Sequence, residues 1–487
     1  MRSPRLNSLC KGLTAVAAFT LAACSTSPAY SPPQVAIPEH YAAASPAASG
    51  WSKASPLDTV PRGRWWAIFN DIELDRLEDQ LTVSNQTLQK AVAQLQQARA
   101  MIDYQHASYL PTVTAGAAEA RTRLSQNVEG HSLAGKTVPD YSAGLLAEWE
   151  PDLFGRVRNA VANARDNAQA SQSDVEAVRL SISSDLASAY FSVRALDVQK
   201  KLLDDSVIAY AAALSILRQQ LRDGAIDASA TAQAETQLES IRTQAIDINV
   251  QRAQVTHAIA TLIGVPASSF SLPPKQEPIT LPVIPAGLPS QLLERRPDIA
   301  AAERHAAAAN AQIGQARAAF YPDLTLSASA GLESTFFAPW LTAPSLFWSL
   351  GPQLVGTLFD GGRRSAALHG ATAQYDAAVA DYRHTVLVAF QQVEDQLSAL
   401  DSLVMEARSQ SLATEAARRS LQLTMNRYQA GAVSYLDVVT VQTIALTNER
   451  AEAQIAARRI DASVHLLKAL GGGWDREALA TTSQSDQ

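Results

Sequence analysis

VEAVRLSISSDLASAYFSVRALDVQKKLLDDSVIAYAAALSILRQQLR, residues 175–222, repeats its apolar residues with a period of seven. The main track contains Val175, Ile182, Ala189, Leu196, Leu203, Tyr210 and Leu217. A neighbouring track, interrupted by Lys200, contains Leu186, Val193, Val207, Leu214 and Leu221. This period is typical of α-helices that pack in a coiled coil.

The helix predicted around this stretch is very long. It extends from Arg156 to Arg222, and a second heptad-bearing helix is predicted from Arg363 to Gln429. Thr414 interrupts the heptad track of the second helix. At 1.5 Å per residue, each helix would be roughly 100 Å long, which no single globular domain can contain. Two such helices predict a rod, or the staves of a tube.

The chain repeats itself. Four landmarks occur twice, 206 to 211 residues apart: Pro111 and Pro322, Gly155 and Gly361, Gly224 and Gly431, and Gly264 and Gly471. Each copy reads helix, strand, loop, strand, long helix, turn, helix. An internal two-fold repeat of one unit is therefore predicted.

Four segments alternate apolar and polar residues, as a strand with one buried face does. They lie near 112–117, 141–150, 324–333 and 348–354, and Leu146 is out of step. Soluble sandwiches alternate in the same way, but strands of about ten residues also suit a bilayer crossing. Four strands cannot close a membrane barrel. Copies must therefore pool strands, eight in a dimer or twelve in a trimer, and a lumen requires the larger number.

The first residues read as a leader. Basic residues precede a short apolar stretch that ends in Leu21, Ala22, Ala23 and Cys24, which is a lipobox. We expect removal of residues 1–23 and lipidation of Cys24; the alternative is an ordinary signal peptide that contains a cysteine. Ser25 after the cysteine indicates an outer-membrane address. Residues 24–64, rich in Pro, Ser and Ala, predict a tether.

Composition excludes several classes. The net charge of −7 gives no basic surface for nucleic acid. Cys10 leaves with the leader, so no cysteine metal site or disulfide is expected. The eight histidines make no metal-binding pair, and no nucleophile–base set or phosphate loop is visible. We expect no enzyme activity, no cofactor and no metal. Glu303–Arg304 and Glu294–Arg296 are predicted to be surface pairs, each contributing under ~1 kcal/mol.

The chain resembles the outer membrane efflux proteins, also called outer membrane factors, a TolC/OprM-like family, from about Trp65 to Trp474. The resemblance is carried by LERRPDI at 293–299, IGQARAAFYP at 313–322 and YQAGAVSYLDV at 428–438. The first two strings are similar to the lipidated, NodT-type branch that serves resistance-nodulation-division (RND) pumps.

This resemblance implies a mixed α/β membrane protein. A trimeric 12-stranded β-barrel, with four strands per chain, would continue into a periplasmic α-helical coiled-coil barrel. Residues near 65–70 and 266–289 would form a belt around the tube. The turns at Gly224 and Gly431 would be tips that contact a periplasmic adaptor, beyond which lies an inner-membrane RND transporter. The implied location is the outer membrane, with outer-membrane lipid as a further partner.

The resemblance also places a periplasmic aperture at these tips. Asp437 matches an acidic position, and Tyr428 matches a tyrosine that holds the tip closed. Many relatives carry a further Asp where this chain has Thr440, so the acidic ring is expected to have one layer. The alternatives are a solvated helix residue for Asp437 and heptad packing for Tyr428.

The resulting organisation has six parts: a signal peptide (1–23), a lipidated tether (24–64), a first repeat (65–265), an equatorial linker (266–289), a second repeat (290–474) and a disordered tail (475–487). The function expected is the outer-membrane channel of a tripartite RND-type efflux system for drugs or other small toxic compounds. The alternatives are the exit duct of a type I protein secretion system and a structural periplasmic coiled-coil lipoprotein without a channel.

Overall fold

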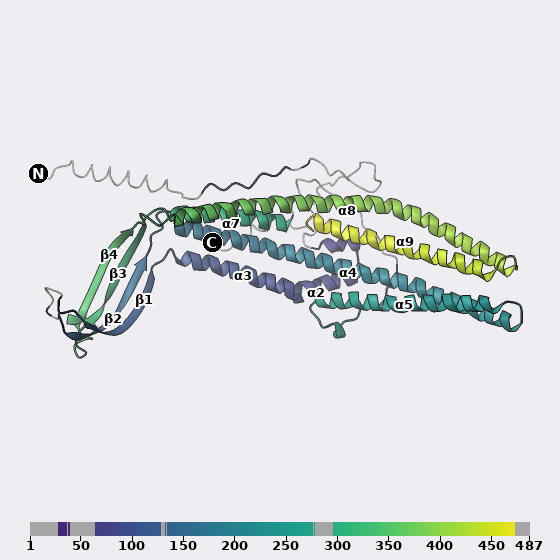
Figure 1. The fold of residues 1–487 in the computed structure, drawn as a ribbon, viewed down its shortest axis with the longest axis horizontal. Coiled ribbons are helices and arrows are strands. Elements are labelled where there is room, and N and C mark those ends of the chain that lie inside the picture. The colour runs from purple at the N-terminus through teal and green to yellow at the C-terminus, as the bar shows by residue number, and fades with distance from the viewer. Residues whose placement is uncertain are drawn as a thin grey trace. The chain divides into compact units, whose positions relative to one another are not determined.

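The computed structural model describes residues 28–36, 38, 64–127, 132, 134–275, 277 and 296–472. The predicted leader, Cys24 and the tail at 475–487 lie outside these residues. The helical elements are η1 (Trp65–Phe69), α2 (Ile72–Ser84), α3 (Gln86–Ala107), α4 (Arg156–Arg222), α5 (Ala228–Leu262), η2 (Ala267–Ser269), α7 (Pro297–Ala318), η3 (Ala343–Ser345), α8 (Arg363–Gln429) and α9 (Tyr435–Ala469). The strands are β1 (Thr112–Arg123), β2 (Thr137–Trp149), β3 (Asp323–Ser334) and β4 (Leu346–Val355) (Figure 1).

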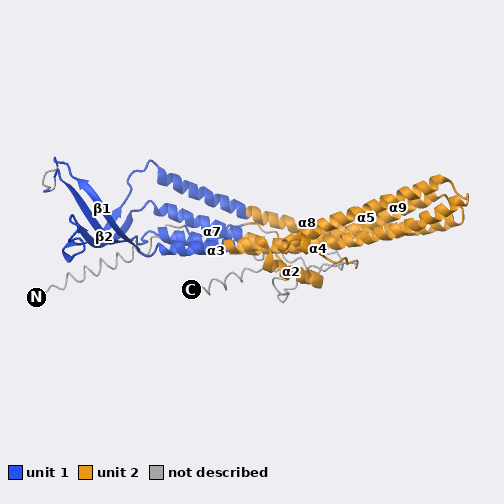
Figure 2. Cartoon of the chain, turned by 90° about the horizontal axis from the view of Figure 1, so that it is seen from below, with its two compact units in different colours: residues 1–34, 94–171, 301–382 blue, residues 35–93, 172–300, 383–487 orange. Residues whose placement is uncertain are grey.

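The chain divides into two compact units (Figure 2). Unit 1 comprises residues 1–34, 94–171 and 301–382, and it holds the four strands and the helical segments next to them. Unit 2 comprises residues 35–93, 172–300 and 383–487, and it holds α2, α5, α9 and the rest of the long helices. None of the described helices combines the length and the apolar character that a membrane crossing needs.

Six of the described helices form three pairs of equal length. Helices α4 and α8 each have 67 residues, α5 and α9 each have 35, and α3 and α7 each have 22. The two long helices begin and end where the sequence predicts. The predicted two-fold repeat of helix, two strands, long helix and helix is therefore confirmed.

The heptad residues of unit 2 form its core. Leu203, Tyr210, Leu214 and Leu217 of α4 are buried together with apolar residues of α5. Thr414, which interrupts the second track, is almost fully buried, and its hydroxyl donates to the Asn448 carbonyl of α9 at 3.3 Å. This polar group is tolerated in the core because its hydrogen-bonding capacity is met by a neighbouring helix.

The strands form one antiparallel sheet in the order β1-β2-β3-β4. The register brings apolar residues of neighbouring strands opposite one another: Val113 and Ala147, Leu145 and Ala330, and Ala328 and Leu350. Paired residues share a face, so one face of the sheet is apolar across all four strands. The opposite face contains a row of glycines, Gly116, Gly144 and Gly331, and also the out-of-step Leu146.

The prediction of surface ion pairs is wrong for Arg296, just before α7, and for Glu303 of α7, whereas Glu294 lies outside the described residues. Arg296 is 7% exposed and donates to Asp298, to the Gln392 side chain at 2.7 Å and to the Ala469 carbonyl. Glu303 is 5% exposed and accepts from Arg304. Both charged groups are thus largely removed from solvent by the segments packed around them. Removing one partner would leave a buried charge, which costs several times the predicted value.

Candidate functional site

Two glycines lie in the turns where the long helices reverse direction and form hairpins. Gly224, between α4 and α5, has φ +72°, and Gly431, between α8 and α9, has φ +75°. In both turns the glycine N–H and the next N–H donate back into the last helical turn, to Leu221 and Gln220 in the first copy. This hydrogen-bond pattern is the Schellman motif. It favours glycine because the residue after the helix must adopt a left-handed backbone conformation. A Cβ at either glycine would meet nothing within 4 Å, so only the backbone conformation demands glycine there.

Asp437 lies in the first turn of α9 and is exposed. Its carboxylate accepts from the Ser434 N–H at 2.9 Å and from the Ser434 hydroxyl at 2.7 Å. These two hydrogen bonds lower the pKa of the Asp437 carboxyl. Within one chain, Asp437 therefore acts as half of a capping box at the start of α9. Thr440 lies one turn later and donates to the Leu436 carbonyl, also in the same helix.

Tyr428 lies in the last turn of α8 and is half-buried. Its ring packs edge-on against Tyr435, with 5.7 Å between ring centroids. Its hydroxyl donates to the Gln220 side chain of α4 at 3.2 Å. Tyr428 therefore combines core packing with a contact between the ends of the two long helices.

Sequence reasoning missed further contacts between the two hairpins. The Gln237 amide donates to Thr443 at 3.1 Å, and Arg450 donates to Gln244 at 2.6 Å. The members of each pair are 206 residues apart, one residue fewer than the separation between the starts of α5 and α9. Nearly equivalent positions of α5 and α9, one residue out of step, thus contact each other. The repeat offset, applied to polar residues with a tolerance of one position, could have found these pairs.

The start of the predicted tether, at Pro28 and Tyr30, is fastened to α7 within unit 1. The Tyr30 hydroxyl donates to the Glu303 carboxylate at 2.7 Å, and the Asn310 amide donates to the Pro28 carbonyl at 3.0 Å. Burial and the neighbouring Glu303 carboxylate raise the pKa of Tyr30, so the phenol stays protonated. Pro28 is four residues beyond Cys24, so the chain is held to the helices soon after the predicted lipid site.

A largely buried ionic network in unit 2 joins Asp71 and Lys275 to α4. Asp71 caps α2 and accepts from Tyr190 at 2.8 Å, Arg194 at 3.1 Å and Lys275 at 3.2 Å. Burial alone would raise the pKa of Asp71, but the hydrogen bonds from Tyr190, Lys275 and the Leu74 N–H lower it. The carboxylate thus stays ionised and ties Lys275 to the helices.

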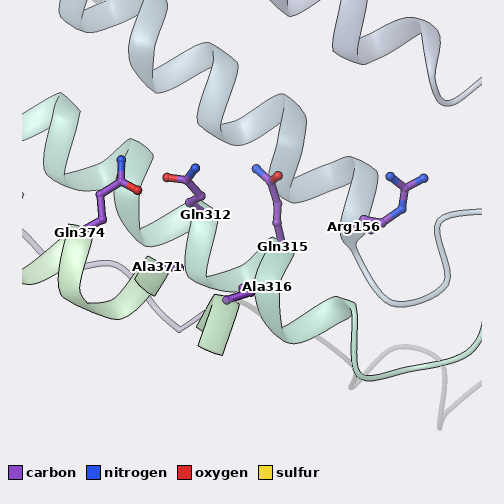
Figure 3. A pocket seen from close by; sticks show the side chains of 7 residues that line it. Arg156, Gln312, Gln315, Ala316, Ala371 and Gln374 are labelled. Atoms are coloured by element: carbon purple, nitrogen blue, oxygen red, sulfur yellow. The ribbon is translucent and has the colours of Figure 1, made fainter. Parts of the chain in front are cut away.

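One cavity of about 440 Å³ lies in unit 1 between α4, α7 and α8 (Figure 3). Its lining consists of Arg156, Gln312, Gln315, Gln374 and the alanines 316, 367 and 371. Arg156 already pairs with the Glu150 carboxylate at 2.5–2.9 Å. What remains is neutral amide surface without a nucleophile or a base. In the described part of the chain, no group of three or more His, Cys, Asp or Glu side chains could hold a metal.

The long paired helices, the four-stranded sheet with one apolar face and the reversing glycines can be compared with known proteins. A family profile described as "Outer membrane efflux protein" matches residues 77–265 and 288–472. The chain belongs to the outer membrane efflux protein family. The family resemblance read from the sequence is therefore confirmed.

Individual relatives agree over nearly the whole length of this efflux protein. It is 33% identical to the outer membrane protein OprJ of Pseudomonas aeruginosa, over 94% of this chain and 95% of that protein. It is 30% identical to the cation efflux system protein CusC of Escherichia coli, over 96% and 99%. A solved structure of the outer-membrane channel OprN, 27% identical, matches with a TM-score of 0.85 over 93% of this chain and all of that one.

Family membership decides between the broad functional classes. This efflux protein is an outer-membrane transport component, and the family is one of channels, not of enzymes. The predicted mixed α/β channel fold and the outer-membrane location are confirmed. The alternative of a structural coiled-coil lipoprotein without a channel is rejected.

Proposed function

We propose that this efflux protein is the exit duct of a tripartite RND-type system that carries drugs or other small toxic compounds. Its partners would be two further copies of itself, a periplasmic adaptor and an inner-membrane RND transporter. Relatives of similar identity are named for different cargoes: cations for CusC, toluene for TtgC of Pseudomonas putida and pyoverdine for OpmQ of Pseudomonas aeruginosa. The cargo is thus better assigned to the pump than to the duct.

The edges of the sheet are the observation that carries this proposal. β1 and β4 are the edge strands, and one face of the sheet is apolar across all four strands as far as Ala117 of β1. In a bilayer, an unpaired strand edge leaves backbone N–H and C=O groups without partners. Pairing β1 of one copy with β4 of the next removes every edge when a ring closes. Three copies of four strands give a barrel of twelve, which is wide enough for a lumen.

The helical tips are proposed to contact the adaptor at the Gly224 and Gly431 turns, and to close the pore with Asp437 and Tyr428. Support comes from the position of all four residues at the ends of the long hairpins and from the exposure of Asp437. Lipidation at Cys24 remains part of the proposal. So do the boundaries predicted for the leader, tether, repeats, linker and tail.

Complementation tests the proposed function. A Gram-negative strain that lacks its own efflux ducts, but retains an RND pump and adaptor, is transformed with this chain. Drug accumulation should fall several-fold with the intact protein. A Gly431→Pro variant, which cannot adopt the left-handed turn, should reach the outer membrane without restoring efflux. Unchanged accumulation with every RND pump and adaptor pair supplied would contradict the drug-efflux role, and export of a protein substrate would favour a type I duct.

A further inference from the structure

The connection between β3 and β4, TFFAPWLTAPS at residues 335–345, is unusually apolar. Three of its side chains are largely exposed: Phe336 at 71%, Phe337 at 70% and Leu341 at 70%. Loops that face water are normally polar, and isolated apolar residues need no explanation, but adjacent large ones do.

The loop is held in a defined conformation by ring packing and hydrogen bonds. The rings of Phe337 and Trp340 pack against Tyr141, with centroids 5.4 and 5.9 Å away. The Trp340 indole N–H donates to the Leu332 carbonyl at 3.3 Å. The Ser334 hydroxyl accepts from the Phe336 N–H at 3.0 Å. The exposed aromatic side chains are thus presented from a fixed framework.

Strand register shows on which face of the sheet this framework lies. Tyr141 shares its face with Ala143, which is paired with Leu332 on the apolar face. The aromatic cluster of Tyr141, Phe337 and Trp340 therefore continues the apolar face beyond the end of β3. On β1 the same face ends differently, because Glu119 lies opposite Tyr141 and forms an ion pair with Arg121 at 3.4 Å.

Chain order shows at which end of the strands the loop lies. Helices α3, α4, α7 and α8 all join the sheet at one end, and the two hairpin connections lie at the other. With the helices in the periplasm, as in the proposed function on which this step rests, the hairpin end meets the outer leaflet. The polar glycine-bearing face lines the lumen, so a loop on the apolar face is directed away from the pore.

We propose that the loop formed by residues 335–345 is a lipid anchor whose exposed side chains insert among the acyl chains of the outer leaflet. Continuity with the membrane-facing side of the sheet selects lipid as the occupant. The aromatic rings, with one polar edge satisfied by the protein backbone, suit the boundary between head groups and acyl chains. On the opposite flank, the Glu119–Arg121 pair marks where β1 leaves the bilayer. With the anchor on one flank and this ion pair on the other, the loop would set the depth and tilt of each copy.

Site-directed fluorescence tests the proposal on the full-length protein in phosphatidylcholine liposomes. A polarity-sensitive thiol probe is attached at Phe336→Cys, or at Ser125→Cys in the other hairpin connection as a matched control. Wild-type protein taken through the same labelling gives the background. The Phe336 probe should be quenched strongly by lipids with a nitroxide on the acyl chain and several-fold less than the control by aqueous iodide. The Ser125 probe should show the reverse.

Two results would overturn the anchor. Quenching of the Phe336 probe by iodide as strongly as the Ser125 probe would place the loop in water. Protection from both quenchers would place it against protein, such as a neighbouring copy. Conductance of the same labelled protein in planar bilayers is recorded in parallel. Channels that conduct while the probe stays in water would refute the anchor and leave the duct standing, whereas absent conductance would count against the duct itself.

Discussion

Asp437 serves two purposes that a single substitution confounds, because its carboxylate caps α9 and also supplies the charge proposed for the aperture. Asp437→Asn keeps an acceptor for Ser434 and removes the charge, whereas Asp437→Ala removes both. If the carboxylate lines the closed aperture, both variants should lose cation preference in planar-bilayer recordings, and Asp437→Arg should favour anions. Since the pKa of Asp437 is lowered, wild-type cation preference should persist at mild acidity and disappear as the pH falls through that pKa. Wild-type selectivity in Asp437→Asn would reduce the residue to a helix cap.

Glu78 of α2 is a second acidic residue, and its protonation state is unexpected. It is fully buried, and burial raises its pKa to about 9, with the Ser183 hydroxyl opposing and Asp79 and Asp75 adding to the shift. The folded state therefore keeps a proton that the unfolded chain releases near pH 4.5. Stability should fall as the pH rises from about 4.5 to about 9, because each pKa unit of difference is worth about 1.4 kcal/mol. Glu78→Gln, a neutral isostere, should flatten the pH dependence of thermal unfolding in detergent and be the more stable protein at pH 8. Parallel profiles for the two proteins would show that Glu78 is ionised in the fold.

At the scale of elements, the spacing of apolar residues and the positions of the turn glycines predicted most of the structure. The heptads and the turn glycines gave the bounds of α4 and α8, and alternation gave the apolar face of the sheet. Burial of Arg296 and Glu303 could not be read from one sequence, because it depends on partners such as Gln392 that lie far along the chain. The aromatic loop was missed because its meaning depends on Tyr141, whose face is fixed by strand register.

The glycine row of the sheet makes a prediction about strand packing. A Cβ on Gly331 would lie 2.3 Å from the Ala143 carbonyl oxygen and 2.6 Å from the Gly144 Cα, which are rigid backbone atoms of β2. Gly331→Ala should therefore force β2 and β3 apart and cost roughly 1–3 kcal/mol. Heat resistance of the oligomer on SDS gels should drop by several degrees. Gly351→Ala is the matched control on β4, because a Cβ there meets nothing within 4 Å. Equal behaviour of the two variants would contradict the close approach of β2 and β3.

At the scale of the whole molecule, closure of the sheet edges between copies makes a prediction about cross-linking. β1 and β4 are separated by two strands, so their backbones within one chain lie roughly 14 Å apart, too far for a disulfide. Any disulfide between Ala115→Cys on β1 and a cysteine placed in turn at Trp348, Leu350 or Leu354 on β4 must therefore join two copies. In outer membranes, at least one of these pairs should give covalent dimers and trimers on non-reducing gels, with native mass spectrometry of the intact protein showing a trimer.

The control for this ladder of cross-linked dimers and trimers is a cysteine pair within one chain. The strand register places its two residues directly opposite each other. Leu145→Cys with Ala330→Cys should form a disulfide without changing the mass, because β2 and β3 are neighbours. If this control closes and no β1–β4 pair does, the edges are not joined to each other, and ring closure through β1 and β4 is wrong. If the cross-linked ladder stopped at the dimer, eight strands would be pooled, and so small a barrel would be filled by its own side chains. A ladder that ends at three is the result that makes the apolar sheet, the unpaired edges and a conducting lumen mutually consistent.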